Sequence, residues 1–108
     1  RKQMQQHKAV FALSLCRKAG ALVTGFDAVK ESVYKGKAAL VLCAQDASEG
    51  TQARVRRFCE GLCQVLTLPC TQAQLAAVTK KNTAVLAVQS AELAKLCASA
   101  AGTAPSHD

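Results

Sequence analysis

Apolar residues along the chain switch repeatedly between helical spacing and short continuous runs. Helical spacing covers residues 3–19, a segment from Phe26 to Lys35, a segment from Asp46 or Ser48 to about Glu60, and the ranges 71–78 and 90–100. The continuous runs lie at 21–24, 38–44, 63–68 and 83–88, and such runs are typical of strands covered on both faces. The pattern therefore predicts five helices alternating with four strands.

Within the predicted helices, spacing of three and four residues marks the face expected to be buried. Those positions are Met4, His7, Val10, Phe11 and Leu15, then Phe26, Val29 and Val33, then Val55, Phe58, Cys59 and Leu62, and finally Leu93, Leu96 and Cys97. Glu31 and Lys35 stand four apart on the second helix and are expected to form an exposed ion pair.

Polar residues at the predicted helix starts have the spacing of N-terminal caps. Thr24 and Asp27 resemble a capping box before the second helix, and Asp46 or Ser48 can cap the third. "TQAQ" at 71–74 is a capping box for the fourth helix.

Strict alternation of helix and strand favours helices on both faces of one sheet. We therefore predict an α/β fold, a three-layer α/β/α sandwich with a central four-stranded mixed sheet. The length of 108 residues suits a single domain. Residues 1–101 are expected to form it, and 102–108, "GTAPSHD", to be a flexible tail.

The charge is strongly basic and unevenly distributed. Fourteen Lys and Arg residues oppose seven Asp and Glu residues, giving +7, and residues 1–37 alone carry eight basic and two acidic side chains. Such a field attracts phosphate backbones, although a solubilising basic surface is the alternative explanation. No apolar stretch approaches the roughly 20 residues of a membrane span, and no export signal is evident, so we expect a cytoplasmic protein.

The six cysteines are expected to be reduced thiols. Cys16, Cys43 and Cys97 lie inside apolar runs, where a free thiol behaves as a small buried hydrophobe. A disulfide framework is more typical of secreted chains with thin cores.

A metal or redox function is the third and weakest hypothesis. Cys59 and Cys63 lie four apart on one predicted helix face, with Cys70 nearby. Structural zinc usually has four ligands, however, and His7 and His107 add no matching pattern. No nucleophile with a base, phosphate-binding loop or carboxylate pair is recognisable, so we expect neither an enzyme nor a cofactor.

Three segments follow one another in a distinctive order: "LSLCRKAGALVTG" at 13–25, "GKAALVLCAQDAS" at 36–48 and "TQAQL" at 71–75. Together they resemble bacterial members of the superfamily of ribosomal proteins L-seven-Ae and L-thirty-e, particularly its YlxQ-like branch. The resemblance covers nearly the whole domain. It implies an α/β/α sandwich that binds RNA, typically a kink-turn, through a strand-to-helix junction and two neighbouring loops.

Kink-turn binders of the superfamily commonly carry "G-T-N-E-x-x-K" at that junction. Ungapped placement puts Gly25 at the glycine, Asp27 at the asparagine, Ala28 at the glutamate and Glu31 at the lysine, with Lys30 one residue early. A glycine there allows a backbone N–H to approach a phosphate, beside the unsatisfied donors of a helix N-terminus. The alternative is an ordinary turn residue before a helix.

The RNA-binding residues that we predict are Arg17, Lys18, Gly25, Asp27, Lys30, Lys37, Lys80, Lys81 and Asn82. The lysines are ordinary solvated charges unless the fold brings them together on one side of the sheet. Asp27 could accept hydrogen bonds from a guanine edge, but we favour a helix-capping function. Phe26 could stack on a base, but its spacing favours core packing.

The leading hypothesis is a small protein that binds ribosomal or other structured RNA by shape and backbone recognition, with ribosomal proteins as further partners. The alternative is a protein-interaction module on the same fold, whose basic face meets an acidic partner. Neither hypothesis requires a membrane or a cofactor.

Overall fold

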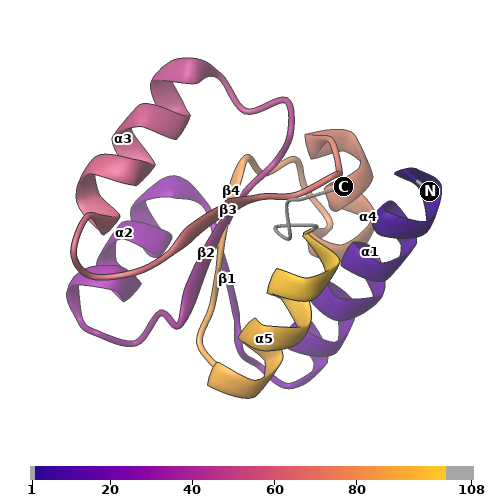
Figure 1. Cartoon of the computed structure of the whole chain (residues 1–108), viewed down its shortest axis with the longest axis horizontal. Coiled ribbons are helices and arrows are strands. Elements are labelled where there is room, and N and C mark those ends of the chain that lie inside the picture. Colours follow the sequence, from indigo (N-terminus) through magenta and orange to yellow (C-terminus); the bar gives the residue numbers. More distant parts are fainter. Residues whose placement is uncertain (1, 102–108) are drawn as a thin grey trace.

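The structure, a computed structural model, describes residues 2–101, so the predicted tail lies outside the described residues (Figure 1). Within them, the four strands and five helices occur in the predicted order. They are α1 (Lys2–Lys18), β1 (Leu22–Thr24), α2 (Phe26–Tyr34), β2 (Leu40–Cys43), α3 (Glu49–Cys59), β3 (Val65–Thr67), α4 (Gln72–Thr79), β4 (Val85–Val88) and α5 (Ala91–Ala100). None of the described helices has the length and apolar character needed to cross a membrane.

The sheet is mixed and its strand order is β1-β4-β2-β3. β4 pairs antiparallel with β1 and with β2, whereas β2 and β3 are parallel. All residues of the central strands β2 and β4 are buried, while the edge strands are partly exposed. The apolar run at 38–44 therefore contains a central strand, as predicted.

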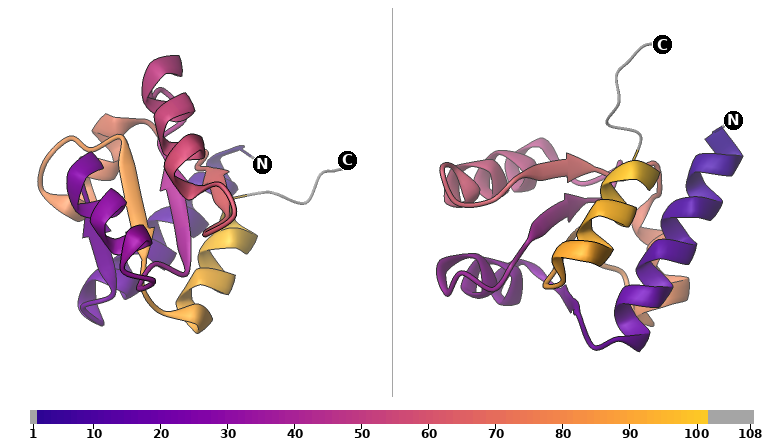
Figure 2. Two further views of the ribbon diagram at one scale, coloured as in Figure 1. Left: turned by 90° about the vertical axis from the view of Figure 1, so that its left-hand side faces the viewer. Right: turned by 60° about the horizontal axis from the view of Figure 1, so that its bottom comes forward.

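Helices cover both faces of the sheet and make the predicted three layers (Figure 2). α1, α4 and α5 enclose one core with the sheet, which includes Leu13, Leu42 and Leu86. α2 and α3 enclose a second core on the opposite face, which includes Val29 and Val55.

The buried face of α1 differs from the prediction. Phe11 is 63% exposed and His7 is also exposed, while the side chain of Met4 lies outside the described part of the structure. The fully covered positions are Ala9, Ala12, Leu13 and Cys16. These residues also have helical spacing, and the small side chains of Ala9, Ala12 and Cys16 allow α1 to lie close to α5.

Two further leucines predicted to point inward are exposed. Leu62 is 60% exposed because α3 ends at Cys59, so helical spacing no longer applies to it. Leu96 is 40% exposed, since α5 packs through Ala94, Cys97 and Ala100.

The predicted caps of α3 and α4 are present. The Ser48 hydroxyl accepts a hydrogen bond from the Thr51 N–H at 3.1 Å. At α4, Thr71 Oγ1 accepts from the Gln74 N–H at 3.2 Å, and the Gln74 side chain accepts from the Thr71 N–H at 2.8 Å. This reciprocal pair is the capping box expected from "TQAQ".

Asp46 does not cap α3 but connects two turns. Its Oδ1 accepts the backbone N–H of Gln72, the first residue of α4, at 2.9 Å. A carboxylate at a helix N-terminus is favoured by the helix dipole. The acidic turn after β2 therefore holds the start of α4 in place.

Candidate nucleic-acid interface

Strand pairing brings four connections to one end of the sheet. Thr24 pairs with Leu86, while Val85 pairs with Cys43, which in turn pairs with Thr67. β1, β2 and β3 therefore end where β4 begins. The β1–α2 junction and the α4–β4 loop are neighbours there, although more than 50 residues separate them in the sequence.

The carbonyl of Val85 ties this junction and this loop together. It accepts the Gly25 N–H at 3.1 Å and the hydroxyl of Thr83 at 3.0 Å. Thr83 is only 5% exposed, so its hydrogen bond is shielded from water. Thr83 was not among the predicted site residues, because no local pattern reveals which carbonyl its hydroxyl reaches.

Gly25 has a backbone conformation that other residues rarely adopt, with φ 97° and ψ 147°. A Cβ at this position would meet nothing within 4 Å, so backbone geometry alone requires glycine. Gly25 is also the N-cap of α2: its carbonyl accepts the Val29 N–H at 3.0 Å.

The predicted capping box of Thr24 and Asp27 is wrong. No side chain caps α2, because the helix begins directly at Phe26 and Gly25 occupies the cap position. Asp27 is exposed on the first turn, where a carboxylate still interacts favourably with the helix dipole. Backbone donors at the start of α2 are consequently available to an anion.

The α4–β4 loop has a defined backbone conformation and three exposed polar side chains, Lys80, Lys81 and Asn82. Lys80 is the C-cap of α4 in the left-handed region, with φ 71°, a position commonly taken by glycine. Its N–H donates to the Ala76 carbonyl at 2.8 Å, and the Thr79 hydroxyl donates to the Lys81 carbonyl at 2.6 Å. Both lysines are thus presented on an ordered loop beside Gly25.

Lys30 and Lys37 lie away from this group. Lys30 is on α2, where its Nζ lies 5.9 Å from the centre of the Tyr34 ring, on the side facing α3. Lys37 precedes β2, whose first residue Leu40 pairs with Val88, the last residue of β4. The expected convergence of the lysines on one side is therefore wrong for Lys37, which lies at the opposite end of the sheet.

Arg17 and Lys18 form part of a separate hollow. They lie on the last turn of α1, shortly before the start of β1, and line the hollow with Ala77 and Val78 of α4. The structure thus brings together Gly25, Asp27 and the α4–β4 loop at the end of β1. Arg17 and Lys18 lie near the start of β1 instead.

Glu31 forms the predicted ion pair with Lys35, at 3.0 Å between Oε2 and Nζ. The hydrogen bond and positive charge of Lys35 lower the pKa of the Glu31 carboxyl. Both side chains are largely exposed, so this pair contributes little to stability.

The cysteines at 59, 63 and 70 do not converge as the metal hypothesis requires. α3 ends at Cys59, so Cys63 does not lie on the same helix face. Cys59 and Cys70 belong to cores on opposite faces of the sheet. No group of three potential metal ligands occurs among the side chains described here.

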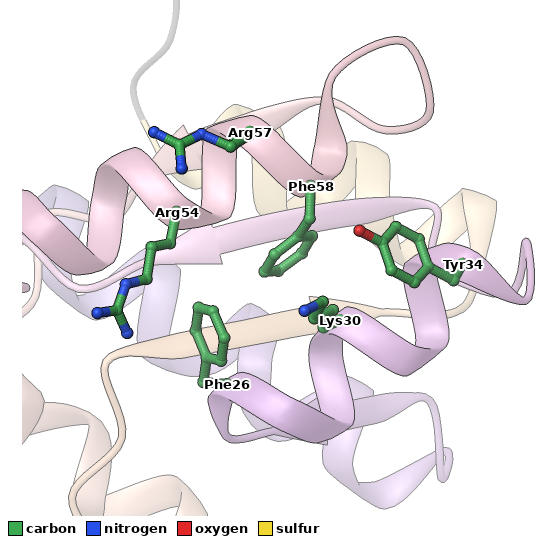
Figure 3. A pocket seen from close by; sticks show the side chains of 6 residues that line it. All are labelled: Phe26, Lys30, Tyr34, Arg54, Arg57 and Phe58. Atoms are coloured by element: carbon green, nitrogen blue, oxygen red, sulfur yellow. The ribbon is translucent and has the colours of Figure 1, made fainter.

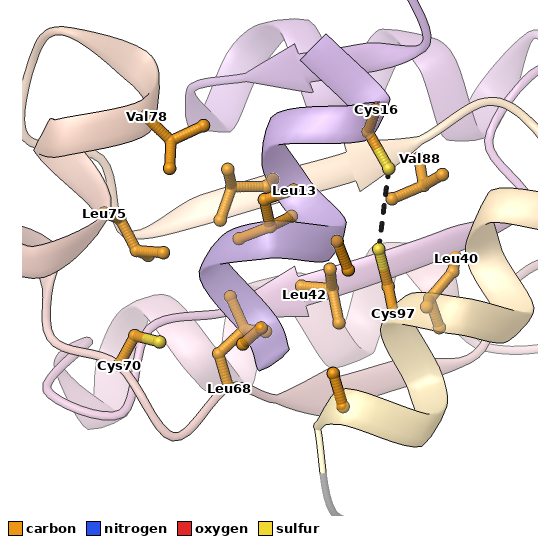
Figure 4. Packing of buried hydrophobic residues seen from close by; sticks show 14 of the residues in the cluster. Leu13, Cys16, Leu40, Leu42, Leu68, Cys70, Leu75, Val78, Val88 and Cys97 are labelled. Carbon is orange, nitrogen blue, oxygen red and sulfur yellow. Dashed lines mark hydrogen bonds between the residues drawn. The ribbon is translucent and has the colours of Figure 1, made fainter. Parts of the chain in front are cut away.

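Cys16, Cys43 and Cys97 are free thiols and are buried, as predicted. Cys16 and Cys97 meet between α1 and α5 with their Sγ atoms 3.5 Å apart (Figure 4). The hydrogen bond with Cys16 and burial both raise the pKa of Cys97, while the same contact lowers the pKa of Cys16.

A pocket between α2 and α3 was missed by the sequence predictions. It is lined by Phe26, Lys30, Tyr34, Arg54, Arg57 and Phe58 and has a volume of about 360 Å³. On α2, the spacing of four residues between Phe26, Lys30 and Tyr34 indicates a shared face. Only the packing of α2 against α3 adds the arginines to that face.

Comparisons with known proteins support the fold. No family model and no curated protein matches the sequence. A Bacillus halodurans protein of unknown function is similar in structure, with a TM-score of 0.78 and 23% identity over 85% of this chain and 94% of that chain. The Giardia lamblia 15.5kD RNA binding protein has a TM-score of 0.70 and 20% identity over 93% of this chain and 87% of that chain. At these identities, the shared property is the α/β/α fold.

Proposed function

We propose that this protein binds structured RNA at the end of the sheet where β1 meets α2. The proposed junction surface consists of Gly25, the first turn of α2 and the exposed loop residues Lys80, Lys81 and Asn82. The observation that carries the proposal is the shared Val85 carbonyl, which holds the junction and the basic loop side by side.

The chemistry of the junction surface suits an RNA backbone. Backbone N–H groups at a helix start without a side-chain cap can donate to a phosphate, and two lysines next to them supply positive charge. The overall charge of +7 adds a long-range attraction to polyanions. The fold shared with the Giardia lamblia 15.5kD RNA binding protein is further support.

A kink-turn in ribosomal or other cytoplasmic RNA is the first candidate ligand, because the junction resembles that of kink-turn binders. Ala28 and Glu31 stand where those proteins commonly carry glutamate and lysine, so we propose recognition through backbone shape and phosphates rather than through these side chains. Lys30 lies close enough in sequence to extend the surface along α2. Contacts with ribosomal proteins, and contacts of Arg17, Lys18 and Lys37 with RNA, remain predictions.

A protein-interaction module is the second candidate function. Phe11 and Leu96 are exposed apolar side chains that line one hollow between α1 and α5. Exposed apolar residues in one hollow are a feature of protein-binding surfaces. This hollow lies across the sheet from α2 and α3, so binding there and RNA binding at the junction can be tested separately.

Charge reversal tests the proposed surface. The double variant Lys80→Glu, Lys81→Glu should weaken RNA binding strongly, because each substitution replaces an attraction to phosphate with a repulsion. The matched control is Lys8→Glu, Lys95→Glu, which changes the net charge equally on exposed residues of α1 and α5. Equal loss of affinity in both variants would indicate a diffuse charge effect and would refute the proposed surface.

A further inference from the structure

The pocket between α2 and α3 contains three of the four aromatic residues of the protein (Figure 3). The centres of the Phe26 and Phe58 rings lie 5.4 Å apart at 78°, and those of Tyr34 and Phe58 lie 6.3 Å apart at 72°. These are edge-to-face contacts. A continuous aromatic wall therefore runs along α2 from its first residue to its last.

Three cations line the pocket together with this wall. Lys30 lies between Phe26 and Tyr34, and Arg54 and Arg57 extend from α3 (Figure 3). No acidic residue lines the pocket, and neither arginine forms an ion pair among residues 2–101. Like charges gathered without a counterion repel one another, so a bound anion would stabilise the group.

Core packing accounts for only part of the arrangement. Phe58 is 7% exposed and, with the half-buried Phe26, closes the second core. Tyr34, in contrast, is 59% exposed, and both arginines are exposed. The ring of Tyr34 and the charge of Arg57 are thus accessible to a ligand.

We propose that this pocket binds one unpaired nucleotide of the RNA that the junction surface holds. The base stacks on the exposed ring of Tyr34, and its phosphate is bound by Lys30 and Arg57. This inference rests on the proposed function. It adds a single-strand contact to a surface that recognises folded RNA.

Position and size both support a nucleotide. Phe26 directly follows Gly25, so the pocket begins at the first turn of α2, within the junction surface, and continues along α2 for about 12 Å at 1.5 Å per residue. Its volume of 360 Å³ lies in the lower part of the range for small-ligand pockets, about 300–1,000 Å³. Aromatic faces flanked by basic side chains are the usual means of binding single-stranded nucleic acid. An acidic peptide would use the cations but would leave the aromatic wall without a stacking partner.

The test compares RNAs that share the same kink-turn and differ only in the single-stranded extension attached to it. The full chain is titrated with a kink-turn RNA with paired ends, with the same RNA carrying an oligoadenylate extension of about five nucleotides, and with an abasic extension of equal length. The abasic extension keeps the phosphates and removes the bases. Free AMP is the fourth ligand, to distinguish a nucleotide within RNA from a small molecule.

Tyr34 also provides a direct signal, since the protein contains one tyrosine and no tryptophan. Stacking of a base on its ring should change the tyrosine fluorescence. We expect this change with the oligoadenylate extension and not with the abasic one. A bound phosphate without a base would leave the ring uncovered.

Two variants remove the proposed contacts, and each has a matched control. Tyr34→Leu removes the stacking face, and Phe11→Leu changes an equally exposed aromatic residue outside the pocket. Arg57→Gln removes one pocket cation, and Arg56→Gln removes its exposed neighbour on α3, which does not line the pocket.

We expect the extension to strengthen binding about 5- to 150-fold, the range for one base–aromatic stack. Tyr34→Leu and Arg57→Gln should lose this gain while binding the paired RNA as well as wild type does. No gain from the extension, or an equal gain with the abasic extension, would overturn the proposal and leave the proposed function intact. Binding of AMP with no gain from the extension would also overturn it, in favour of a small-molecule site. Failure of every RNA to bind would instead refute the proposed function, and this inference with it.

Discussion

Lys80→Gly should make the fold more stable and RNA binding weaker at the same time. Lys80 has φ 71°, and a left-handed conformation costs a non-glycine residue about 1–2 kcal/mol. Glycine avoids this cost, but it also makes the unfolded chain more flexible, which lowers the gain by about 0.4–1 kcal/mol. With the middle of each range, the expected net gain in the free energy of unfolding is about 0.8 kcal/mol.

Urea denaturation followed by circular dichroism measures this gain, which corresponds to a rise in melting temperature of about 2–4 °C for a chain of this size. Gly61→Ala is the matched backbone control, because Gly61 has φ 75° and open space for a Cβ. It should destabilise the fold for the same reason. A destabilised Lys80→Gly variant would refute the assigned backbone conformation or show that the side chain stabilises the loop.

The same variant separates charge from conformation in RNA binding. Loss of one phosphate contact should reduce the slope of log affinity against log salt by about 0.7–0.9. Lys80→Gln removes the charge but keeps the strained backbone. It should reduce the salt slope by the same amount, while its free energy of unfolding stays within about 0.5 kcal/mol of wild type. An unchanged slope in both variants would exclude Lys80 from the RNA contact.

Three other predictions concern the elements that position the junction surface and the core. Thr83→Val should lower the free energy of unfolding by about 0.5–1.5 kcal/mol, because it removes the hydrogen bond to Val85. It should also lower RNA affinity without changing the charge, and unchanged affinity would show that this bond does not position the loop. Asp46→Ala should lower the free energy of unfolding by about 1 kcal/mol, because it removes the acceptor for the Gln72 N–H. Asp46→Asn keeps an acceptor oxygen and should retain most of the stability in denaturation experiments. Burial raises the pKa of Cys59 to about 12 from its ordinary value of 9.0, so the unfolded chain ionises first and stability should fall as pH rises from 9 towards 12. Cys59→Ala should reduce this fall by up to about 1.4 kcal/mol per pH unit, and an unchanged pH dependence would contradict the assignment.

The number, order and type of elements could be predicted because each combines a clear period with a local signal at its ends. The capping box at 71–74 and the apolar run that contains β2 are examples. The buried face of α1 could not be predicted in the same way. The large apolar side chain of Phe11 suggests burial, but Ala9 and Ala12 are the buried residues and Phe11 is exposed. Close packing between helices favours small residues, and that preference depends on a neighbour that the local sequence does not specify.

The candidate site was only partly predictable. Gly25 could be identified from its position between a strand and a helix, but its capping function replaced the one expected for Thr24 and Asp27. Which loops share an end of the sheet depends on strand order and direction, so Lys37 was expected on the wrong side. Packing of α2 against α3 likewise created the aromatic pocket, from residues of two helices that are far apart in the sequence.

The most direct test of RNA recognition at the junction surface is a titration of the full chain with two RNAs across a salt series. One RNA contains a kink-turn, and the other is the same duplex without the bulge. We predict tighter binding to the kink-turn RNA, with affinity that falls as salt rises by about 0.7–0.9 log units per log unit for each phosphate contact. Equal affinity for the two RNAs would contradict kink-turn recognition, and no binding to either RNA at low salt would contradict the central claim that this surface binds structured RNA.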